Sequence, residues 1–228
     1  MDKRLRKVGV VVAGLAVLCF SFSVTAENVA KTEQRDKSLQ KQSLTSDEKQ
    51  YLLTLARKTL EQYLKGGAPT GVPGNLYPNL QEKRGCFVTL MEHGELRGCI
   101  GYIEPIKPLC DCVIENAINA AVRDTRFPAL MSMEELGSIS IEISVLTVPE
   151  KVVLQNPAEF LDHLVPGRDG VILKQGWHQA TYLPQVWEHF PDKEDFLNSL
   201  CQKGGMPIGC WKDEGTEIYL YRAEVFHE

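Results

Sequence analysis

The sequence predicts an α+β protein in which helices pack on an antiparallel β-sheet. Two segments, residues 85–103 and 170–183, each contain a pair of β-like apolar runs separated by a short turn, which is the pattern of a β-hairpin. Two further segments, residues 44–64 and 109–123, have apolar residues at helical spacing. Because a hairpin joins antiparallel strands, two hairpins mixed with helices favour an antiparallel sheet that helices cover.

The first 26 residues have the organisation of a secretory signal peptide. Basic residues within 3–7 precede the apolar run 8–22, and Val-Thr-Ala then supplies small residues before a cleavage site. Cleavage after Ala26 predicts an exported protein, either periplasmic or secreted. The alternative is that residues 8–24 remain as an uncleaved membrane anchor, because about 17 residues are barely enough to span a bilayer.

A polar linker is predicted over residues 27–43, because this stretch has no apolar period. The domain then occupies residues 44–228. Thr45, with Glu48 three positions later, forms a capping box, which predicts the start of an amphipathic helix that ends at Gly66. A loop rich in proline and glycine follows.

The other elements follow in order along the chain. His93-Gly94 is the expected tight turn of the first hairpin. Strict alternation of apolar and polar residues predicts a half-buried strand over 138–147. Further along, we expect a short helix that starts at Asn156-Pro157, a helix capped by Asp192, and a last strand over 217–225.

The charge balance disfavours a nucleic-acid-binding protein. The chain has 25 lysines and arginines against 30 aspartates and glutamates, and a formal net charge of −5 at pH 7. Since affinity for a phosphate backbone comes mainly from clustered cations, we expect no nucleic-acid partner. The sequence does not identify a cofactor.

Of the seven cysteines, six lie after the signal peptide, namely Cys86, Cys99, Cys110, Cys112, Cys201 and Cys210. An even number in an exported chain suggests disulfides, but the sequence does not determine their pairing. Cys110 and Cys112 would point to nearly opposite sides of one helix, so they are poorly placed to bind one metal ion. The paired Cys-x2-Cys pattern of a zinc site is missing, and we therefore predict no metal site. Cys201 is predicted to lie in the core.

The stretch ELRGCIGYI, residues 95–103, places an arginine and a cysteine beside glycines in a predicted strand. If His93-Gly94 is a two-residue turn, Glu92 pairs with Glu95, and this register continues along the hairpin. The face predicted to point towards the core then carries Phe87, Thr89, Met91, Leu96, Gly98 and Ile100. The face predicted to point away from it carries Cys86, Val88, Leu90, Arg97, Cys99 and Gly101.

Cys99 is the leading candidate for a functional residue. A guanidinium on the same strand face, about 7 Å away, favours a thiolate, so we predict Cys99 as a nucleophile and Arg97 as an anion clamp. Gly98 and Gly101 would allow a ligand or another backbone to approach closely. Two alternatives remain open: Cys99 is a small buried hydrophobic residue, or it forms a disulfide with its diagonal neighbour Cys86.

Several ordered motifs closely resemble those of the AMMECR1 family, whose prokaryotic members are called AmmeMemoRadiSam system protein A. The motifs are LRGCIG (96–101), NAINAAVRDTRFPAL (116–130), IEISVL (141–146), GVIL (170–173), ATYLPQVW (180–187) and FLNSLCQKGG (196–205). The resemblance implies an α+β fold with an antiparallel β-sheet flanked by helices and a smaller second lobe. It also implies a cleft between the lobes, lined by the LRGCIG segment.

The resemblance suggests partners as well, because prokaryotic relatives are associated with a Memo-like protein and a radical SAM protein. It implies no reaction, since the family's biochemical activity is not established. We predict a cleft-based enzyme, or an accessory subunit of one, that uses Cys99 and Arg97. The alternative is a non-catalytic binding module whose glycine-rich cleft accepts a protein partner or a ligand.

Four further residues are candidates for the site. Glu142 lies on the strand face opposite the core isoleucines and is a candidate acid or base, or simply part of a solvated face. Arg126 either forms an ion pair with Asp124 that orients the loop after the helix or reaches the cleft. His178 is a candidate base for a cysteine, with an ordinary surface histidine as the alternative. Gln185 is the group of its segment that we expect to hydrogen-bond a ligand.

Overall fold

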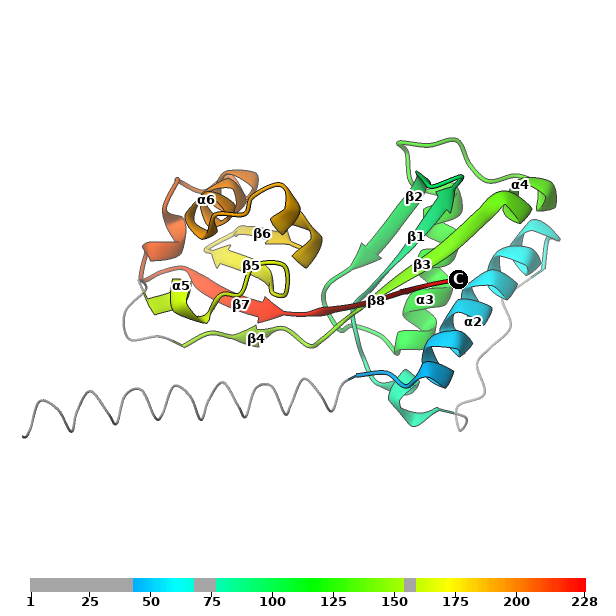
Figure 1. Ribbon diagram of the computed structural model, residues 1–228, viewed down its shortest axis with the longest axis horizontal. Coiled ribbons are helices and arrows are strands. Elements are labelled where there is room, and N and C mark those ends of the chain that lie inside the picture. The colour runs from blue at the N-terminus through cyan, green and yellow to red at the C-terminus, as the bar shows by residue number, and fades with distance from the viewer. Residues whose placement is uncertain (1–42, 68–76, 154–158) are drawn as a thin grey trace, which may run out of the picture. The chain divides into compact units, whose positions relative to one another are not determined.

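The computed structural model describes residues 43–67, 77–153 and 159–228, and Figure 1 shows its ribbon. The predicted signal peptide, the linker up to residue 42 and the expected helix start at Asn156-Pro157 lie outside these residues. In the described part of the chain, no helix is long and apolar enough to cross a membrane. The described elements form two antiparallel four-stranded sheets accompanied by five α-helices, which confirms the predicted α+β class.

The larger lobe is built on a sheet with the strand order β2-β1-β3-β8. Its strands are β1 (Cys86–Glu92), β2 (Glu95–Tyr102), β3 (Ile139–Leu146) and β8 (Ala223–His227). Its helices are α2 (Ser46–Leu64), α3 (Leu109–Val122), α4 (Met133–Ser138) and the 3-10 helix η1 (Pro78–Gln81). Helices α2 and α3 pack on each other and on the central strands, so they cover one face of this sheet (Figure 1). We call the opposite face the outer face.

Local sequence explains why α2 starts and how it packs. The Thr45 side chain accepts a hydrogen bond from the Glu48 backbone N–H, and the Glu48 carboxylate accepts one from the Thr45 N–H, which confirms the predicted capping box. Leu52, Ala56 and Leu60 then fall on one side of the helix and are fully buried. The helix therefore contributes an apolar stripe to the core of the larger lobe.

The smaller lobe has a second sheet with the strand order β4-β7-β5-β6. Its strands are β4 (Glu150–Lys151), β5 (Gly170–Gln175), β6 (His178–Tyr182) and β7 (Glu217–Tyr221). Its helices are α5 (Phe160–His163), α6 (Lys193–Lys203) and the 3-10 helices η3 (Pro184–Glu188) and η4 (Cys210–Lys212). A separate apolar core fills this lobe, and it includes the stacked rings of Trp187 and Phe196, whose centroids lie 3.7 Å apart.

The predicted last strand is in fact two strands that belong to different sheets. Strand β7 ends at Tyr221 and pairs with β4 and β5, whereas β8 starts at Ala223 and pairs with β3. Only Arg222 lies between them. A third apolar cluster of Leu146, Ile172 and Tyr221 lies where the chain passes from one sheet to the other.

The first hairpin is present, but its register differs from the predicted one. His93 and Gly94 both have positive φ, as a tight hairpin turn requires, and Glu92 pairs with Glu95. A β-bulge then shifts the register, so that Leu90 lies opposite Gly98 and every later pair is displaced by one residue. The assignment of the β1 faces is therefore wrong: Cys86, Val88 and Leu90 are fully buried in the core.

Two disulfides are present among the described residues. Cys86 of β1 is joined to Cys112 of α3, with 6.3 Å between their Cα atoms, and Cys201 of α6 is joined to Cys210 of η4, with 5.9 Å. The alternative of a Cys86–Cys99 disulfide is wrong, because Cys86 points towards α3 and Cys99 points to the opposite face of the sheet. Cys99 and Cys110 are free thiols.

Candidate functional site

Four side chains form one row across the outer face of the larger sheet. Cys99 of β2 lies opposite Thr89 of β1, and Thr89 also lies opposite Glu142 of β3. His227 of β8 lies opposite Glu142 and completes the row. Because directly opposite residues project from the same face, all four point away from α2 and α3. Strands lie about 4.8 Å apart, so Cys99 and Glu142 are separated by about 10 Å with Thr89 between them.

Alternation along the strands explains why this row is available to a ligand. On β3, Ile141 and Ile143 are fully buried beneath the helices, whereas Glu142 between them is partly exposed. Cys99 and Thr89 are also partly exposed, and His227 is exposed. The prediction that the Glu142 side chain lies on the other face of the strand from the core isoleucines is therefore confirmed. Glu142 shares the outer face with Cys99.

The sulfur and the backbone of Cys99 are held by three different residues. The hydroxyl of Thr89 donates a hydrogen bond to the Cys99 sulfur, with 3.3 Å between the two atoms. The Cys99 N–H donates to a carboxylate oxygen of Asp124 at 2.9 Å, and its carbonyl accepts from the Arg126 guanidinium at 3.4 Å. Asp124 and Arg126 thus hydrogen-bond the free edge of β2 at the position of the thiol.

The Asp124–Arg126 pair is both an ion pair and the support of Cys99. The Asp124 side chain is only 4% exposed, and it accepts hydrogen bonds from Nε and Nη2 of Arg126 at 2.9 and 2.7 Å. The hydrogen bonds from Arg126, followed by the one from the Cys99 N–H, hold the pKa of Asp124 well below its ordinary value although burial opposes this. The Arg126 side chain is 57% exposed, so it also presents positive charge beside Cys99.

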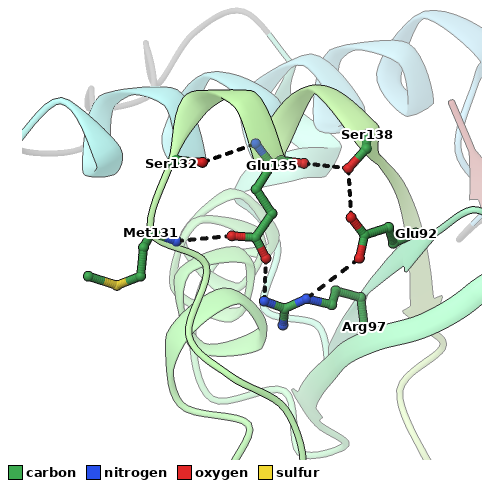
Figure 2. A network of polar contacts seen from close by, with 6 residues as sticks. All are labelled: Glu92, Arg97, Met131, Ser132, Glu135 and Ser138. Atoms are coloured by element: carbon green, nitrogen blue, oxygen red, sulfur yellow. Dashed lines mark hydrogen bonds and ion pairs between the residues drawn. The ribbon is translucent and has the colours of Figure 1, made fainter.

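Arg97 belongs to a different network, which Figure 2 shows. Its guanidinium donates to Glu135 of α4, and its Nε lies 4.0 Å from the Glu92 carboxylate. Glu135 also accepts from the Met131 N–H at 3.3 Å, and the Ser138 hydroxyl donates to Glu92 at 2.8 Å. Among the described residues, no hydrogen bond or ion pair joins Arg97 to Cys99. Arg97 therefore links the β1–β2 hairpin to α4, and Arg126 supplies the positive charge near Cys99.

The two glycines of the LRGCIG segment are required by the fold itself. A side chain at Gly98 would overlap the carbonyl oxygen of Ala120 in α3, and one at Gly101 would overlap the Cys86 carbonyl and the Phe87 ring. The close approach predicted for both positions is thus made by the protein's own backbone and side chains.

His178 and Gln185 both lie away from the row that contains Cys99. His178 starts β6 of the smaller lobe, and its Nδ1 lies 3.0 Å from the Gly204 carbonyl oxygen. Gln185 lines a cavity of about 480 Å³ together with Ala223 and Val225 of β8. The lining of this cavity includes no residue of the LRGCIG segment, so the cavity is distinct from the cleft that the family resemblance implies.

The second free thiol provides an internal contrast to Cys99. Cys110 is 1% exposed, and burial, followed by the charge of Asp111, raises the pKa of its thiol to about 12. Such a thiol is inert at neutral pH. Within the part of the chain that the structure describes, no group of three or more histidine, cysteine, aspartate or glutamate side chains is arranged to hold a metal ion.

The fold and the ordered motifs define a two-lobed α+β protein, and comparison with known proteins gives its family. The sequence profile of the AMMECR1 family matches residues 53–226. A protein of Methanothermobacter thermautotrophicus is 43% identical over 186 residues, which are 81% of this chain and 96% of the relative. Protein MJ0810 of Methanocaldococcus jannaschii is 42% identical over 189 residues, which are 81% of this chain and 92% of the relative.

Solved structures agree with the sequence comparison. The crystal structure of the uncharacterized protein PH0010 from Pyrococcus horikoshii is similar with a TM-score of 0.68 and 42% sequence identity. The similarity covers 78% of this chain and 90% of that protein. The chain therefore belongs to the AMMECR1 family, whose biochemical activity is not established.

Sequence reasoning missed Thr89 and His227 as members of the row. Thr89 was assigned to the core face because the predicted register had no bulge, and the corrected register places it opposite Cys99. His227 lies two residues beyond the predicted last strand, and only the pairing of β8 with β3 brings it to Glu142. The bulge that moves Thr89 to the outer face has one signal in the sequence, Gly98, since a glycine in a strand often marks a bulge.

Proposed function

We propose that this protein is a thiol-dependent group-transfer enzyme, or an accessory subunit of one, that acts on a small molecule lying on the outer face of the larger sheet. The observation that carries the proposal is the row in which Cys99 and Glu142 are separated by Thr89. A small molecule placed over Thr89 would contact the sulfur on one side and the carboxylate on the other.

The chemistry assigned to the row has two steps. In the first, the sulfur of Cys99, as its thiolate, forms a bond to an electrophilic carbon of the substrate, and the leaving group departs with the bonding electron pair. In the second, Glu142 accepts a proton from a water molecule that bonds to the same carbon, and the sulfur departs as thiolate. The proton on Glu142 then passes to the leaving group. Thr89 donates a hydrogen bond to the sulfur throughout.

Alkylation tests whether Cys99 reacts as a nucleophile. At pH 7.5, iodoacetamide should modify Cys99 at least about 100-fold faster than Cys110, whose thiol is buried with a pKa of about 12. Thr89→Val should slow the modification of Cys99 about 3- to 10-fold, which is the effect of losing one neutral hydrogen bond. Site assignment by mass spectrometry measures both rates in one sample. Equal rates at the two cysteines would contradict the proposal.

A chromogenic ester tests the two steps separately. With p-nitrophenyl acetate, the wild-type protein should release a burst of nitrophenolate that Cys99→Ser abolishes. Glu142→Gln should keep the burst and slow the later turnover, because only the second step uses the carboxylate. If Cys99→Ser leaves nitrophenolate release unchanged, the thiol takes no part and a non-catalytic binding module is the better description. Gly98 and Gly101 do not support that module, because the fold itself requires both.

Export and partners are further parts of the proposal. The two disulfides support export, since such bonds persist in oxidising compartments. The Memo-like and radical SAM proteins are proposed as partners on the family resemblance alone. Fractionation of cells, followed by mass determination of the N-terminus, would show whether the chain is exported and cleaved after Ala26. Retention of the whole chain in the cytosol would contradict the exported form.

A further inference from the structure

Strand β8 is an edge of the larger sheet, so one side of it pairs with no strand in the part of the chain that the structure describes. The Thr147 N–H donates to the Arg222 carbonyl, and the Glu228 N–H donates to the Ile141 carbonyl, so the even-numbered positions of β8 face β3. Hydrogen-bonded and non-hydrogen-bonded pairs alternate in an antiparallel ladder. The N–H and C=O groups of the odd-numbered positions, Ala223 and Val225, therefore point away from the sheet.

The contacts of the neighbouring strand support this assignment. Leu146 lies opposite Ala223, but its N–H donates to the Gly85 carbonyl on the far side of β3. The Leu146–Ala223 pair is thus a non-hydrogen-bonded pair, as the alternation requires. Among the described residues, the outward backbone groups of Ala223 and Val225 have no hydrogen-bond partner.

The cavity of about 480 Å³ lies against these two residues. Its lining includes Ala223 and Val225 of β8, Pro184, Gln185 and Glu188 of η3, and Pro166. The prolines have no N–H to offer, whereas the β8 backbone and the side chains of Gln185 and Glu188 supply groups that can hydrogen-bond an occupant. Val225 is 43% exposed beside this space.

We infer that the β8 edge and this cavity form a docking site for an extended peptide segment of a partner protein. The segment pairs with Ala223 and Val225 as a fifth strand of the larger sheet, since only an extended backbone offers N–H and C=O groups at the matching spacing. One apolar side chain of the segment enters the cavity, and a cationic side chain lies beside the Glu188 carboxylate. A second copy of this chain paired through β8 is the competing occupant, and sedimentation tests for it. The inference does not depend on the reaction at Cys99.

Position 225 allows a sharp test of the backbone pairing. Val225→Pro removes the outward N–H and leaves the ladder with β3 intact, because that ladder uses the neighbouring even-numbered residues. Val225→Thr is the matched control, since it keeps the N–H and the β-branched shape. Thermal unfolding of both variants, followed by circular dichroism, verifies that they fold.

The probe is a phage-displayed library of random decapeptides, selected on the full-length protein. The selected peptides are synthesised with a fluorescent label and titrated by anisotropy. Val225→Pro should weaken their binding about 5- to 10-fold, Val225→Thr should change it less than about twofold, and Glu188→Gln should weaken only peptides that carry a cation. In the wild-type protein, a saturating peptide should slow hydrogen exchange of the Val225 amide. This measurement does not depend on the folding of any variant.

Chemical changes in the peptide provide a second test of the backbone pairing. In a selected peptide, N-methylation of either the odd-numbered or the even-numbered residues should abolish binding, and N-methylation of the other set should leave binding unchanged. The reason is that only one side of an added strand faces β8. Three results would overturn the inference. The library yields no peptide whose binding depends on the Val225 N–H; N-methylation has the same effect at both sets of residues; or sedimentation shows a wild-type dimer that Val225→Pro converts to a monomer.

Discussion

Replacing Asp124 by asparagine should separate the support of Cys99 from the rest of the fold. Asparagine has the same shape, but its amide nitrogen cannot accept a hydrogen bond. Asp124 accepts four hydrogen bonds with distances of 2.7 to 3.2 Å, three from Arg126 and one from the Cys99 N–H. The variant therefore removes the negative charge of the Asp124–Arg126 pair and leaves at least one hydrogen-bond donor without an acceptor.

The expected loss of stability can be estimated from these contacts. A hydrogen bond to a charged group contributes about 1.5–3 kcal/mol, and a neutral one contributes about 1 kcal/mol. Arg126 is largely exposed and can turn towards water, so the partly buried Cys99 N–H dominates the cost. We expect Asp124→Asn to lower the free energy of unfolding by about 2–4 kcal/mol at pH 7, and urea denaturation measures this difference. Asp47→Asn on the exposed start of α2 is the control, with an expected change of less than about 0.5 kcal/mol.

The difference in unfolding free energy between the wild-type protein and Asp124→Asn should also depend on pH in a defined direction. The hydrogen bonds from Arg126 and Cys99 hold the folded-state pKa of Asp124 below the unfolded value of about 3.9. Stability from such a carboxyl is fully present above the unfolded pKa and is lost as the pH falls through the folded pKa. The gap between wild type and Asp124→Asn should thus stay constant from pH 8 to about pH 5 and narrow below about pH 4. A gap that widens on acidification would show that the Asp124 carboxylate does not stabilise the folded protein.

Two further predictions concern the framework around the site. Gly98→Ala should lower the free energy of unfolding by about 1–3 kcal/mol, because its methyl group overlaps the Ala120 carbonyl, whereas Gly137→Ala in α4 has open space and should be neutral or slightly stabilising. Equal effects of the two substitutions in chemical denaturation would contradict this account. Replacing Cys86 and Cys112 by alanine should cost about 3.5 kcal/mol, and replacing Cys201 and Cys210 about 2.5 kcal/mol, because the first disulfide spans 26 residues and the second spans 9. Calorimetry of the two double variants measures which of them loses more unfolding free energy. A larger loss in the Cys201 and Cys210 variant would show that loop entropy does not dominate.

Local patterns were sufficient to predict most of the elements. The capping box at Thr45, the turn at His93-Gly94 and the alternation along β3 depend on residues a few positions apart, and all three are confirmed. The side of β3 that carries Glu142 was predictable for the same reason, because strand periodicity relates burial directly to sequence.

The pairing between strands was predictable only in part. A single bulge in the hairpin reversed the assignment of the β1 faces, which moved Thr89 to the outer face and Cys86 to the core. Apart from Gly98, the shift leaves no local signature, since a displacement by one residue leaves the apolar content of both strands unchanged. The Cys86–Cys112 disulfide follows from this shift, because a buried Cys86 meets α3.

Local patterns and motifs were enough to establish the α+β class, the family, the capped helices and the choice of Cys99 and Glu142 as candidates on one face of a sheet. Tertiary packing was needed to show that Arg126 rather than Arg97 hydrogen-bonds Cys99, and that His227 completes the row. It also decided that the chain leaves one sheet at Tyr221 and enters the other at Ala223. Distance along the chain accounts for this division. Propensity and periodicity act over a few residues, whereas the contact of Arg126 with Cys99 joins residues 27 positions apart and the pair of Glu142 and His227 joins β3 to β8. Both contacts depend on how whole elements pack.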